Sequence, residues 1–264
     1  MEKKNVILGC VIAVTLFLLT IPDNGYAGYD NYVTVNGTPG DDTQITFATP
    51  LRDKIVQNGF DGEDTQVIEG NADDDWLEQD GGDGDDNQYI GGGGGNSRIL
   101  QDGGEGSDAQ IGNGDSGNDR IKQYGGTGDD FIDADGGADS DYIIQHGGRG
   151  DDMLFLDGGD WDDIVEMCGE DGADTMTYDV SPGKDRAFID GGRGEDNLTI
   201  YANSQNFTVY EAYIKKIGKK SKLFYKKLYS QYNQLASGYS VVKMKDVEHG
   251  TIIGNDGTTP VYWW

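Results

Sequence analysis

The sequence predicts an all-β protein built as a parallel β-roll or β-helix solenoid of about twenty-two residues per coil, closed by a small C-terminal cap that is β or α+β. Three observations predict it: an eleven-residue unit repeats fifteen times from Gly37 to Tyr201, each unit begins with a glycine-rich loop, and certain side chains recur in every second unit. A fixed period of this kind is typical of stacked repeat proteins, in which each unit packs only on its neighbours.

Each repeat divides into a loop of six residues, G-G-x-G-x-D, and a tail of five, as in GGTGDDFIDAD at 125–135. Position one is glycine in thirteen of the fifteen copies, and the exceptions are Ala48 and Val180. Position six is aspartate in fourteen copies, and the exception is Ser97. Glycines permit the positive φ angles of tight turns, and the tails are rich in residues that favour strands. Each repeat therefore predicts one turn and one strand.

Two repeats together predict one coil, because a single repeat is too short to enclose a core of side chains. Glutamine recurs in every second repeat, at Gln44, Gln66, Gln88 and Gln110 in one set and at Gln57, Gln79, Gln101, Gln123 and Gln145 in the other. In the second set, one column is apolar throughout and is expected to face inward: Ile55, Leu77, Ile99, Ile121, Ile143, Val165 and Ala187. Side chains in such columns stack at the spacing between strands, about 4.8 Å.

The inward column of the first set of repeats is expected to change along the chain. The early repeats favour Ile45, Val67, Tyr89 and Ile111 inside, and the later ones favour Ile132, Leu154, Met176 and Leu198. A shift of one residue exchanges the two faces of a strand. The pattern therefore predicts a kink within residues 112–128.

Residues 1–27 are typical of a secretory signal peptide. Lys3 and Lys4 precede the apolar run Val6–Ile21, and Gly25-Tyr26-Ala27 offers a small-x-small cleavage site. We expect a secreted protein, extracellular or at the cell surface, with the periplasm as the alternative and no transmembrane span after cleavage. Residues 28–36 are expected to lead into the roll. Cleavage leaves Cys168 as the single cysteine, which excludes an internal disulfide framework.

The charge of the chain is strongly segregated. Residues 37–201 hold 41 acidic against 9 basic residues, a net of −32, whereas residues 202–264 hold nine lysines against four acids, a net of +5. A chain this acidic is a poor partner for nucleic acid. So many carboxylates in one compact body repel each other unless counter-ions bind, so we expect folding to depend on cations.

The loops resemble the glycine-rich calcium-binding repeat G-G-x-G-x-D-x-U-x of RTX-type (hemolysin-type) proteins, in which U is a large aliphatic residue. The resemblance covers about 165 of the 264 residues and recurs in register. The period departs from the family, since it is eleven instead of nine, as if two residues were added to each strand. The loop keeps its length, so the resemblance still implies a β-roll whose loops bind calcium.

The resemblance implies several Ca²⁺ ions between neighbouring loops on each side of the roll, held by backbone oxygens of the glycine turns and by the position-six carboxylates. Loops two repeats apart would share ions, which sets a ceiling of thirteen that imperfect loops lower. The residues implied as ligands are Asp42, Asp64, Asp75, Asp86, Asp108, Asp119, Asp130, Asp141, Asp152, Asp163, Asp174, Asp185 and Asp196, with Gly84, Gly106, Gly128, Gly150 and Gly194.

The ligand chemistry also favours calcium, because it takes six to eight oxygen ligands, whereas magnesium demands octahedral geometry and retains waters. Zinc and iron are poorly served by His146, His249 and one cysteine. The alternative is that glycine and aspartate serve only as turn residues. Turns alone do not require aspartate in one column fourteen times.

Residues 202–264 are expected to cap the last coil, because an open coil exposes unpaired backbone. Segments 206–210, 239–244 and 250–254 are typical of strands, whereas apolar residues at helical spacing allow an amphipathic helix over 213–235. This region carries a cluster of lysines: Lys215, Lys216, Lys219, Lys220, Lys222, Lys226 and Lys227. Three interpretations remain open for it, namely a solvated face, docking to an anionic cell-surface polymer or lipid, and pairing with the acidic body of another copy.

We therefore expect an exported, non-enzymatic calcium-binding β-roll that folds on calcium binding and acts as a surface, matrix or adhesion module. The sequence shows no Ser/His/Asp or Cys/His set in a credible context, and its carboxylates form a repeated ladder instead of one distinct pair. The alternatives are a carbohydrate-active β-helix enzyme or accessory module, and a mineral-binding protein.

Overall fold

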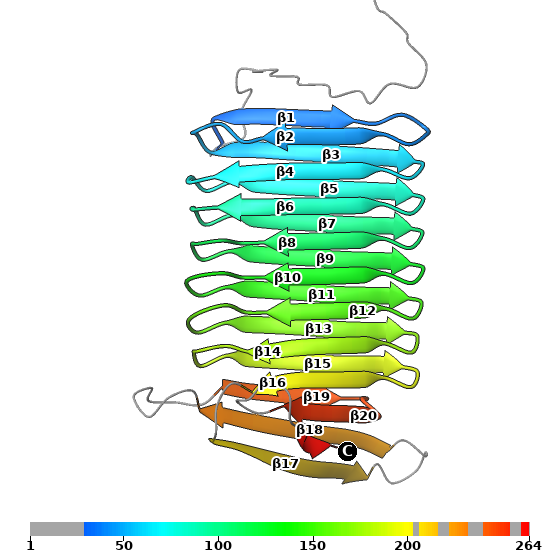
Figure 1. The fold of residues 1–264 in the computed structure, drawn as a ribbon, viewed down its shortest axis with the longest axis vertical. Coiled ribbons are helices and arrows are strands. Elements are labelled where there is room, and N and C mark those ends of the chain that lie inside the picture. Colours follow the sequence, from blue (N-terminus) through cyan, green and yellow to red (C-terminus); the bar gives the residue numbers. More distant parts are fainter. Residues whose placement is uncertain (1–28, 203–205, 216–221, 232–239, 254–259, 264) are drawn as a thin grey trace, which may run out of the picture.

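The chain folds into a flattened stack of coils whose strands form two facing sheets, as the computed structural model shows in Figure 1. The structure describes residues 29–202, 206–215, 222–231, 240–253 and 260–263. The expected signal peptide, residues 1–27, lies outside them. From β1 to β16, successive strands alternate between the two sheets, so each pair of these strands with its two turns makes one coil. An all-β parallel solenoid is therefore confirmed.

The first sheet has eleven strands. In spatial order they are β1 (Asn31–Asn36), β3 (Asp53–Asp61), β5 (Trp76–Asp83), β7 (Arg98–Glu105), β9 (Arg120–Thr127), β11 (Tyr142–Arg149), β13 (Ile164–Asp171), β15 (Arg186–Arg193), β19 (Ser240–Lys245), β18 (Lys222–Gln231) and β17 (Asn206–Lys215).

The second sheet has ten strands. In spatial order they are β2 (Thr43–Phe47), β4 (Thr65–Asn71), β6 (Asn87–Gly93), β8 (Ala109–Asn113), β10 (Phe131–Asp135), β12 (Met153–Asp157), β14 (Thr175–Val180), β16 (Asn197–Ala202), β20 (His249–Ile253) and β21 (Pro260–Trp263).

Neighbouring strands of the repeats are parallel and are paired in register at an offset of two repeats, as in Ile55 opposite Leu77 and Ile132 opposite Leu154. This confirms that two repeats make one coil. The roll starts before the first repeat, because β1 pairs with β3 at the same offset. Most of the expected lead-in, residues 28–36, is thus a strand of the first coil.

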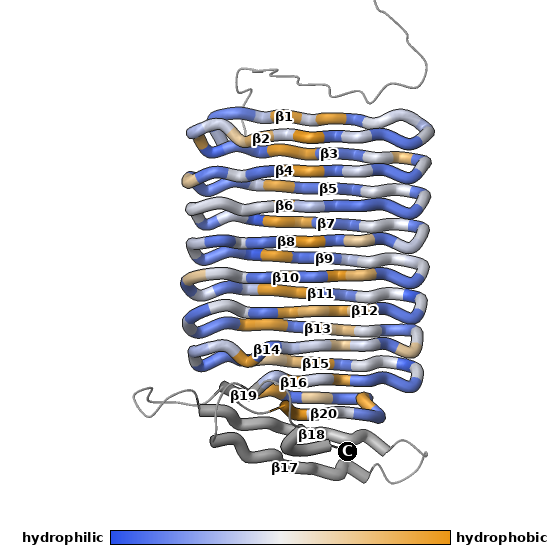
Figure 2. Tube along the Cα trace, viewed as in Figure 1, coloured by the Kyte–Doolittle hydropathy of each residue, from blue (hydrophilic) through white to orange (hydrophobic). Residues whose placement is uncertain are grey.

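The core is a thin layer between the two sheets. Every member of the column Ile55, Leu77, Ile99, Ile121, Ile143, Val165 and Ala187 is buried, as predicted. Apolar residues lie in the middle of the strands and polar residues concentrate in the turns (Figure 2). Since each coil contributes only a few apolar side chains, hydrophobic burial per residue is small for a chain of this length.

The inward column expected for the early repeats of the first set was wrong, whereas the later column from Ile132 to Leu198 is buried as predicted. Gln44, Gln66 and Gln88 are buried in the early repeats, while Ile111 is 40 % exposed. Gln110 lies directly opposite Ile132, so one column runs through all the repeats and the kink predicted within residues 112–128 does not exist.

Glutamine can face inward because its amide groups bond to each other along the stack. Nε2 of Gln88 donates to Oε1 of Gln66 at 3.0 Å and to the carbonyl oxygen of Asp102 in the other sheet at 2.8 Å. Burying a polar group costs little free energy when the group is hydrogen-bonded. An assignment based on polarity alone therefore placed the wrong residues of these strands inside. The amide columns end at Gln110 and Gln145, whose Oε1 atoms have no partner because apolar residues follow them.

The roll continues after an excursion at its C-terminal end. β19 pairs in parallel with β15, and β20 with β16, which adds one more coil. β17 and β18 form an antiparallel hairpin beside β19, and β21 pairs antiparallel with β20. The β cap is thus observed. The alternative helix over 213–235 is wrong where the structure describes it, because β18 pairs with β19 and so provides hydrogen-bond partners for the backbone at the edge of the sheet. No helix among the described residues is long and apolar enough to cross a membrane.

Candidate metal centre: two ladders of buried carboxylates

The position-six aspartates form two columns, one along each edge of the roll. One edge holds Asp42, Asp64, Asp86, Asp108, Asp130, Asp152, Asp174 and Asp196, and the other holds Asp53, Asp75, Asp119, Asp141, Asp163 and Asp185. All of them except Asp42 are buried, with exposed fractions of 3 % or less. Each residue stands at the end of a turn, and the strand that follows holds it in place. The repeated sequence thereby stacks like charges inside the protein.

In twelve of these fourteen aspartates, Oδ1 links two coils by accepting a backbone N–H. Oδ1 of Asp130 accepts a hydrogen bond of 2.8 Å from the backbone N–H of Asp108, which lies one coil earlier. The same bond recurs along both edges with lengths of 2.5–3.2 Å, and Asp196 N–H donates to Glu248 at the end of the first ladder. Hydrogen bonds to an ionised acceptor are stronger than neutral ones, so these bonds set the spacing of the turns.

The second oxygen, Oδ2, is buried without a hydrogen-bond partner in ten of these aspartates. They are Asp64, Asp86, Asp108, Asp119, Asp130, Asp141, Asp152, Asp163, Asp174 and Asp196. A buried polar atom without a partner costs about 1–3 kcal/mol, and more when it carries charge. Ten such atoms in a native fold therefore require protons or cations.

The residue at position two decides whether Oδ2 has a partner. In the ten loops with an unpartnered Oδ2, which we call open loops, position two has a left-handed backbone, with φ from +66° at Asp115 to +114° at Gly148. In three further loops, which we call closed loops, the backbone there is not left-handed and its N–H donates to Oδ2: Thr38 to Asp42 and Thr49 to Asp53, both at 2.5 Å, and Asn71 to Asp75 at 3.2 Å.

Glycine at position one makes room for the open carboxylate. A β-carbon placed on Gly81 would lie 2.3 Å from Oδ2 of Asp86 and 2.5 Å from the carbonyl oxygen of Gly103 in the next coil. The same two kinds of oxygen face the corresponding glycine of most other open loops, as at Gly125, with Asp130 and Gly147. An unpartnered carboxylate oxygen and a carbonyl from the neighbouring turn are thus held on one side of a residue that has no side chain. Such oxygen donors suit a hard cation.

Burial shifts the acidity of the ladders. It is the main cause that raises the pKa of Asp86 and Asp130 to about 7 and that of Asp119 and Asp163 to about 8. The hydrogen bond from the preceding coil opposes the shift, and neighbouring carboxylates add to it. Without a cation, these groups hold protons near neutral pH.

The position-four glycines that the resemblance implies as ligands lie in the same turns. Gly84, Gly106 and Gly128 have φ of +134°, +140° and +128°, and the N–H of Gly84 donates to the carbonyl of Glu105 at 2.6 Å. Gly150 and Gly194 repeat this backbone, with φ of +139° and +159°. The carbonyl oxygen of Gly84 faces Gly106, since a β-carbon there would approach it to 2.0 Å. Backbone oxygens therefore line this edge, the one that holds Asp86 to Asp196, beside the carboxylates.

The carboxylates do not gather in threes. Among the described residues, the sole group of three His, Cys, Asp or Glu ligand atoms within 4.8 Å of one another is His146, Glu166 and Cys168, away from both ladders. A cation between two coils would hence draw on one or two carboxylates and on backbone carbonyls. All of these donor atoms are oxygens. In the loop that ends at Asp185, Oδ2 lies 3.5 Å from the hydroxyl oxygen of Ser181.

Sequence reasoning missed several participants. Glu248 accepts the N–H of Asp196 at 3.1 Å and so replaces the position-six aspartate in the added coil, although a long insertion separates the two residues along the chain. Position five forms a second, exposed ladder that runs in the opposite direction, as where Asp85 accepts the N–H of Ser107 at 2.8 Å. The available signal was the recurrence of Asp, Asn or Ser in that column, in ten of the fifteen repeats.

The lysine cluster is divided by the structure. Lys215 ends β17, and Lys222, Lys226 and Lys227 lie in β18, with Lys226 opposite both Glu211 and Met244. The remaining members, Lys216, Lys219 and Lys220, lie outside the described residues. The lysine cluster and its three interpretations therefore stay at the stage of prediction.

Comparisons with models of protein families, with curated proteins and with solved structures find no match for this chain. The resemblance to calcium-binding repeats consequently rests on the residues of the repeat and on a solenoid with a buried aspartate in nearly every repeat.

Proposed function

We propose that this protein is an exported, non-enzymatic calcium-binding β-roll of the RTX type that folds when calcium binds. The observation that carries the proposal is the set of ten buried Oδ2 atoms without partners, stacked along both edges of the roll. The open loops would hold the ions through these carboxylates and through carbonyl oxygens of the neighbouring turns. Bound calcium would supply the positive charge that the ladders need to be ionised inside the protein.

Calcium suits the loops better than other common cations. Its ligands are oxygens at about 2.3–2.6 Å in flexible geometry, so one coordination sphere can combine carboxylates and carbonyls from two turns. Magnesium requires a near-ideal octahedron, which a repeated backbone turn is poorly shaped to supply. Zinc prefers nitrogen and sulfur, which the ladders lack.

Folding and calcium binding would be coupled for an energetic reason. The thin core gives little hydrophobic stabilisation, and the charge of −32 on residues 37–201 opposes compaction. Ion binding that exists only in the folded state adds directly to its stability. Weak sites, with Kd on the order of 10⁻⁴–10⁻³ M as in extracellular modules, suffice for a chain that condenses only outside the cell.

The role we propose is that of a surface, matrix or adhesion module, with an anionic cell-surface polymer or a second copy as partner. Two features of the sequence support it: the signal-like segment 1–27 and the basic C-terminal region beside an acidic body. Folding triggered by calcium would keep the chain extended until it has crossed the membrane.

The test is a calcium titration of residues 28–264 followed by circular dichroism, with magnesium in parallel and calorimetry to count the ions. We expect a cooperative transition from coil to β structure at sub-millimolar to millimolar calcium, reversed by chelator, with several ions bound. A roll that stays folded in excess chelator at pH 8 and binds no calcium would contradict the proposal and would make the aspartates protonated or solvated turn residues.

A further inference from the structure

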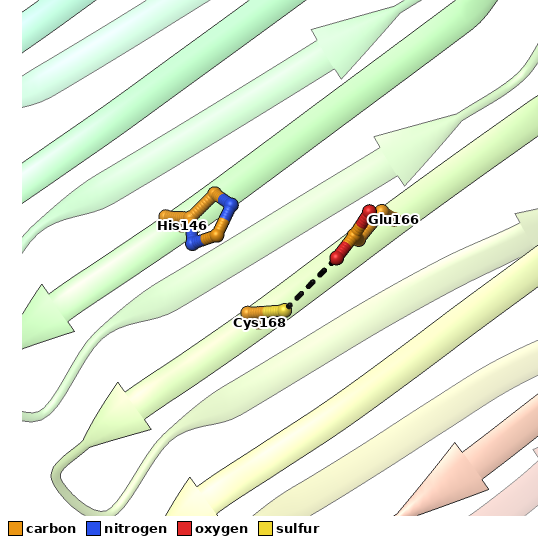
Figure 3. Close-up of side chains that lie close together, drawn as sticks. All are labelled: His146, Glu166 and Cys168. Carbon is orange, nitrogen blue, oxygen red and sulfur yellow. Dashed lines mark hydrogen bonds between the residues drawn. The ribbon is translucent and has the colours of Figure 1, made fainter.

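We infer that the outer face of the first sheet carries a second kind of metal site, a zinc-type site formed by His146, Glu166 and Cys168. One ligand atom from each of these side chains lies within 4.8 Å of the other two. Figure 3 shows the three side chains gathered on two neighbouring strands, with the carboxylate of Glu166 directed toward the sulfur of Cys168. This site is separate from the carboxylate ladders and does not depend on what they bind.

The sheet itself holds the three residues in place. His146 of β11 lies directly opposite Cys168 of β13 in the parallel register. Glu166 and Cys168 are two positions apart on one strand, so their side chains project from the same face. Because β11 and β13 are interior strands of an eleven-stranded sheet, their spacing is fixed by hydrogen bonds on both sides.

The imidazole ring of His146 is oriented in advance. Its Nδ1 lies 2.6 Å from Oε1 of Glu170, and the ring stacks on Tyr124 with centroids 5.3 Å apart and planes inclined by 23°. Histidines that bind metals commonly use one ring nitrogen for a carboxylate while the other faces the ion, which fixes the tautomer and the ring plane. Glu170 and Tyr124 are in position to serve as such supports.

The sulfur of Cys168 lies among acidic side chains. Its Sγ is 3.9 Å from Oε1 of Glu166, and Asp190 stands directly opposite Cys168 on the next strand. A divalent ion would compensate this negative charge and bind the sulfur as a thiolate.

The mixture of ligands indicates which metal fits. One nitrogen, one sulfur and one oxygen match the preferences of zinc, whereas calcium and magnesium bind oxygen almost exclusively. A further oxygen stands on the next strand, where Asp190 lies opposite Cys168 and its Oδ1 is buried without a hydrogen-bond partner. Its other oxygen, Oδ2, is held by Lys245 at 2.5 Å.

The site is open to solutes on one side. Glu166 also forms part of the wall of a groove of about 570 Å³ on the outer face of the same sheet. Tyr142, Ile164 and Phe188 give this groove an apolar surface, and Arg186 adds a positive charge. His146, Glu166 and Cys168 are themselves all partly exposed, so an ion can reach them without unfolding the sheet.

The experiment uses residues 28–264 in excess calcium, so that hard-cation sites are occupied and the fold is maintained. Cobalt(II) is titrated first, because a cobalt–thiolate bond gives a charge-transfer absorption in the near ultraviolet that oxygen ligands do not give. Zinc is then added to displace it, and zinc affinity is measured against a chromogenic chelator. We expect one ion per chain and complete displacement of cobalt by zinc.

Matched variants separate this site from unspecific binding. Cys168→Ser is expected to abolish the charge-transfer band, and His146→Gln and Glu166→Gln to weaken zinc binding at least tenfold. Glu170→Gln, which removes the carboxylate beside Nδ1 of the imidazole, is expected to weaken zinc binding about 10–100-fold. His249→Gln is the control, because His249 is the other histidine of the chain and pairs with Glu195 at 3.5 Å, away from this face; it should bind as the unchanged protein does.

Two results would overturn the inference. One is the absence of a cobalt–thiolate band in the folded, calcium-saturated protein. The other is zinc binding of unchanged strength in both Cys168→Ser and His146→Gln, which would place the ion elsewhere. Circular dichroism of each variant identifies loss of fold, and His146→Gln, a change on the outer side of β11, keeps the test decisive if the cysteine variant unfolds.

Discussion

The closed loops, which all lie within the first four repeats, and the open loops contain the same aspartate in two different electrostatic situations. In a closed loop such as 48–53, both oxygens of Asp53 accept hydrogen bonds, Oδ2 from the N–H of Thr49 and Oδ1 from the side chain of Asn31. In an open loop such as 125–130, Oδ1 of Asp130 is bonded and Oδ2 has no partner. Both carboxylate oxygens have hydrogen-bond partners in the first loop, whereas only one has a partner in the second.

The difference arises from one residue rather than from the aspartate. Gly126, at position two of the open loop, has φ of +110°, while Thr49 at the same position of the closed loop keeps an ordinary backbone. A turn of one handedness satisfies the carboxylate with its own N–H, and a turn of the other handedness leaves one carboxylate oxygen without a hydrogen-bond partner. The comparison teaches that backbone conformation, as much as charge, decides which buried carboxylates of the repeat are available to a cation.

The largest expected effect is on the calcium-free roll as pH rises. Folded-state pKa values of about 6–8 exceed the ordinary value of 3.8, so the folded state binds more protons than the unfolded state. Its stability is therefore fully present below about pH 4 and is lost as pH rises through 6–8. In chelator, the urea concentration at the midpoint of unfolding should fall over this pH range, and saturating calcium should abolish the fall.

Hydrogen exchange locates this effect. In chelator at pH 8, amides of the open-loop coils, from β6 onward, should lose protection before those of β1 and β2. Uniform loss of protection along the roll would contradict the distinction between the two classes of loop.

The next effect is that of a side chain at position two. Gly126→Ala places a β-carbon 2.1 Å from the carbonyl oxygen of Gly104 in a left-handed residue, so we expect a loss of at least about 3 kcal/mol in the free energy of unfolding. Thr49→Ala leaves the backbone conformation unchanged and removes a hydroxyl that donates to Asp53 and accepts from Asn31, so it should cost about 1–2 kcal/mol. Urea unfolding in calcium compares them, and equal losses would refute the role of handedness.

Replacing the aspartate by asparagine should act with opposite signs in the two classes when calcium is absent. Asp130→Asn keeps an acceptor for the N–H of Asp108 and removes a buried charge, so it should stabilise the roll in chelator at pH 8 and lower the number or affinity of bound calcium ions. Asp53→Asn replaces Oδ2, which accepts the N–H of Thr49, by an NH₂ group that is itself a donor. It should therefore lower the free energy of unfolding by about 1–3 kcal/mol with or without calcium. Calorimetric ion counts and urea unfolding give both quantities, and the same sign in chelator would argue against the assignment of open and closed loops.

The smallest effect sharpens the comparison by adding a carboxylate. Ser97 stands at position six of a loop whose Gly93 has φ of +86°, which is the open conformation, and its hydroxyl bonds the carbonyl of Gly92 at 3.0 Å. Ser97→Asp should raise calcium affinity or add one ion, and should slightly destabilise the calcium-free roll at pH 8. A calcium titration beside that of the unchanged protein measures this gain, and no gain would mean that the aspartate is insufficient in an open loop.

Much of the fold followed from the period. The recurrence of Asp130 and its equivalents once in each repeat predicted the turns, and the apolar column from Ile55 to Ala187 predicted both the two-repeat coil and its inward face. Repetition strengthens such inferences, because a residue that departs from the pattern in one repeat is outweighed by the residues at the same position in the other repeats. The aspartate ladders were found for the same reason.

Other features depend on contacts between neighbouring coils. Gln88 faces inward because Gln66 stands one coil away to accept its amide hydrogen, which a polarity pattern along one strand cannot reveal. Phe60 and Glu170 adopt left-handed backbones without being glycine, with φ of +82° and +78°, at the position where Gly82 and Gly148 stand in the neighbouring turns.

What the sequence by itself determined is the chemistry of each column: which residue repeats, how often, and with what charge. What only the tertiary structure decided is how columns meet. Glu248 completes a ladder across an insertion of different sequence, and His146 meets Cys168 because a parallel register places residues two repeats apart side by side. The physical reason is that hydrogen bonds and contacts between coils join residues distant in the chain, and their geometry depends on the backbone of both coils at once.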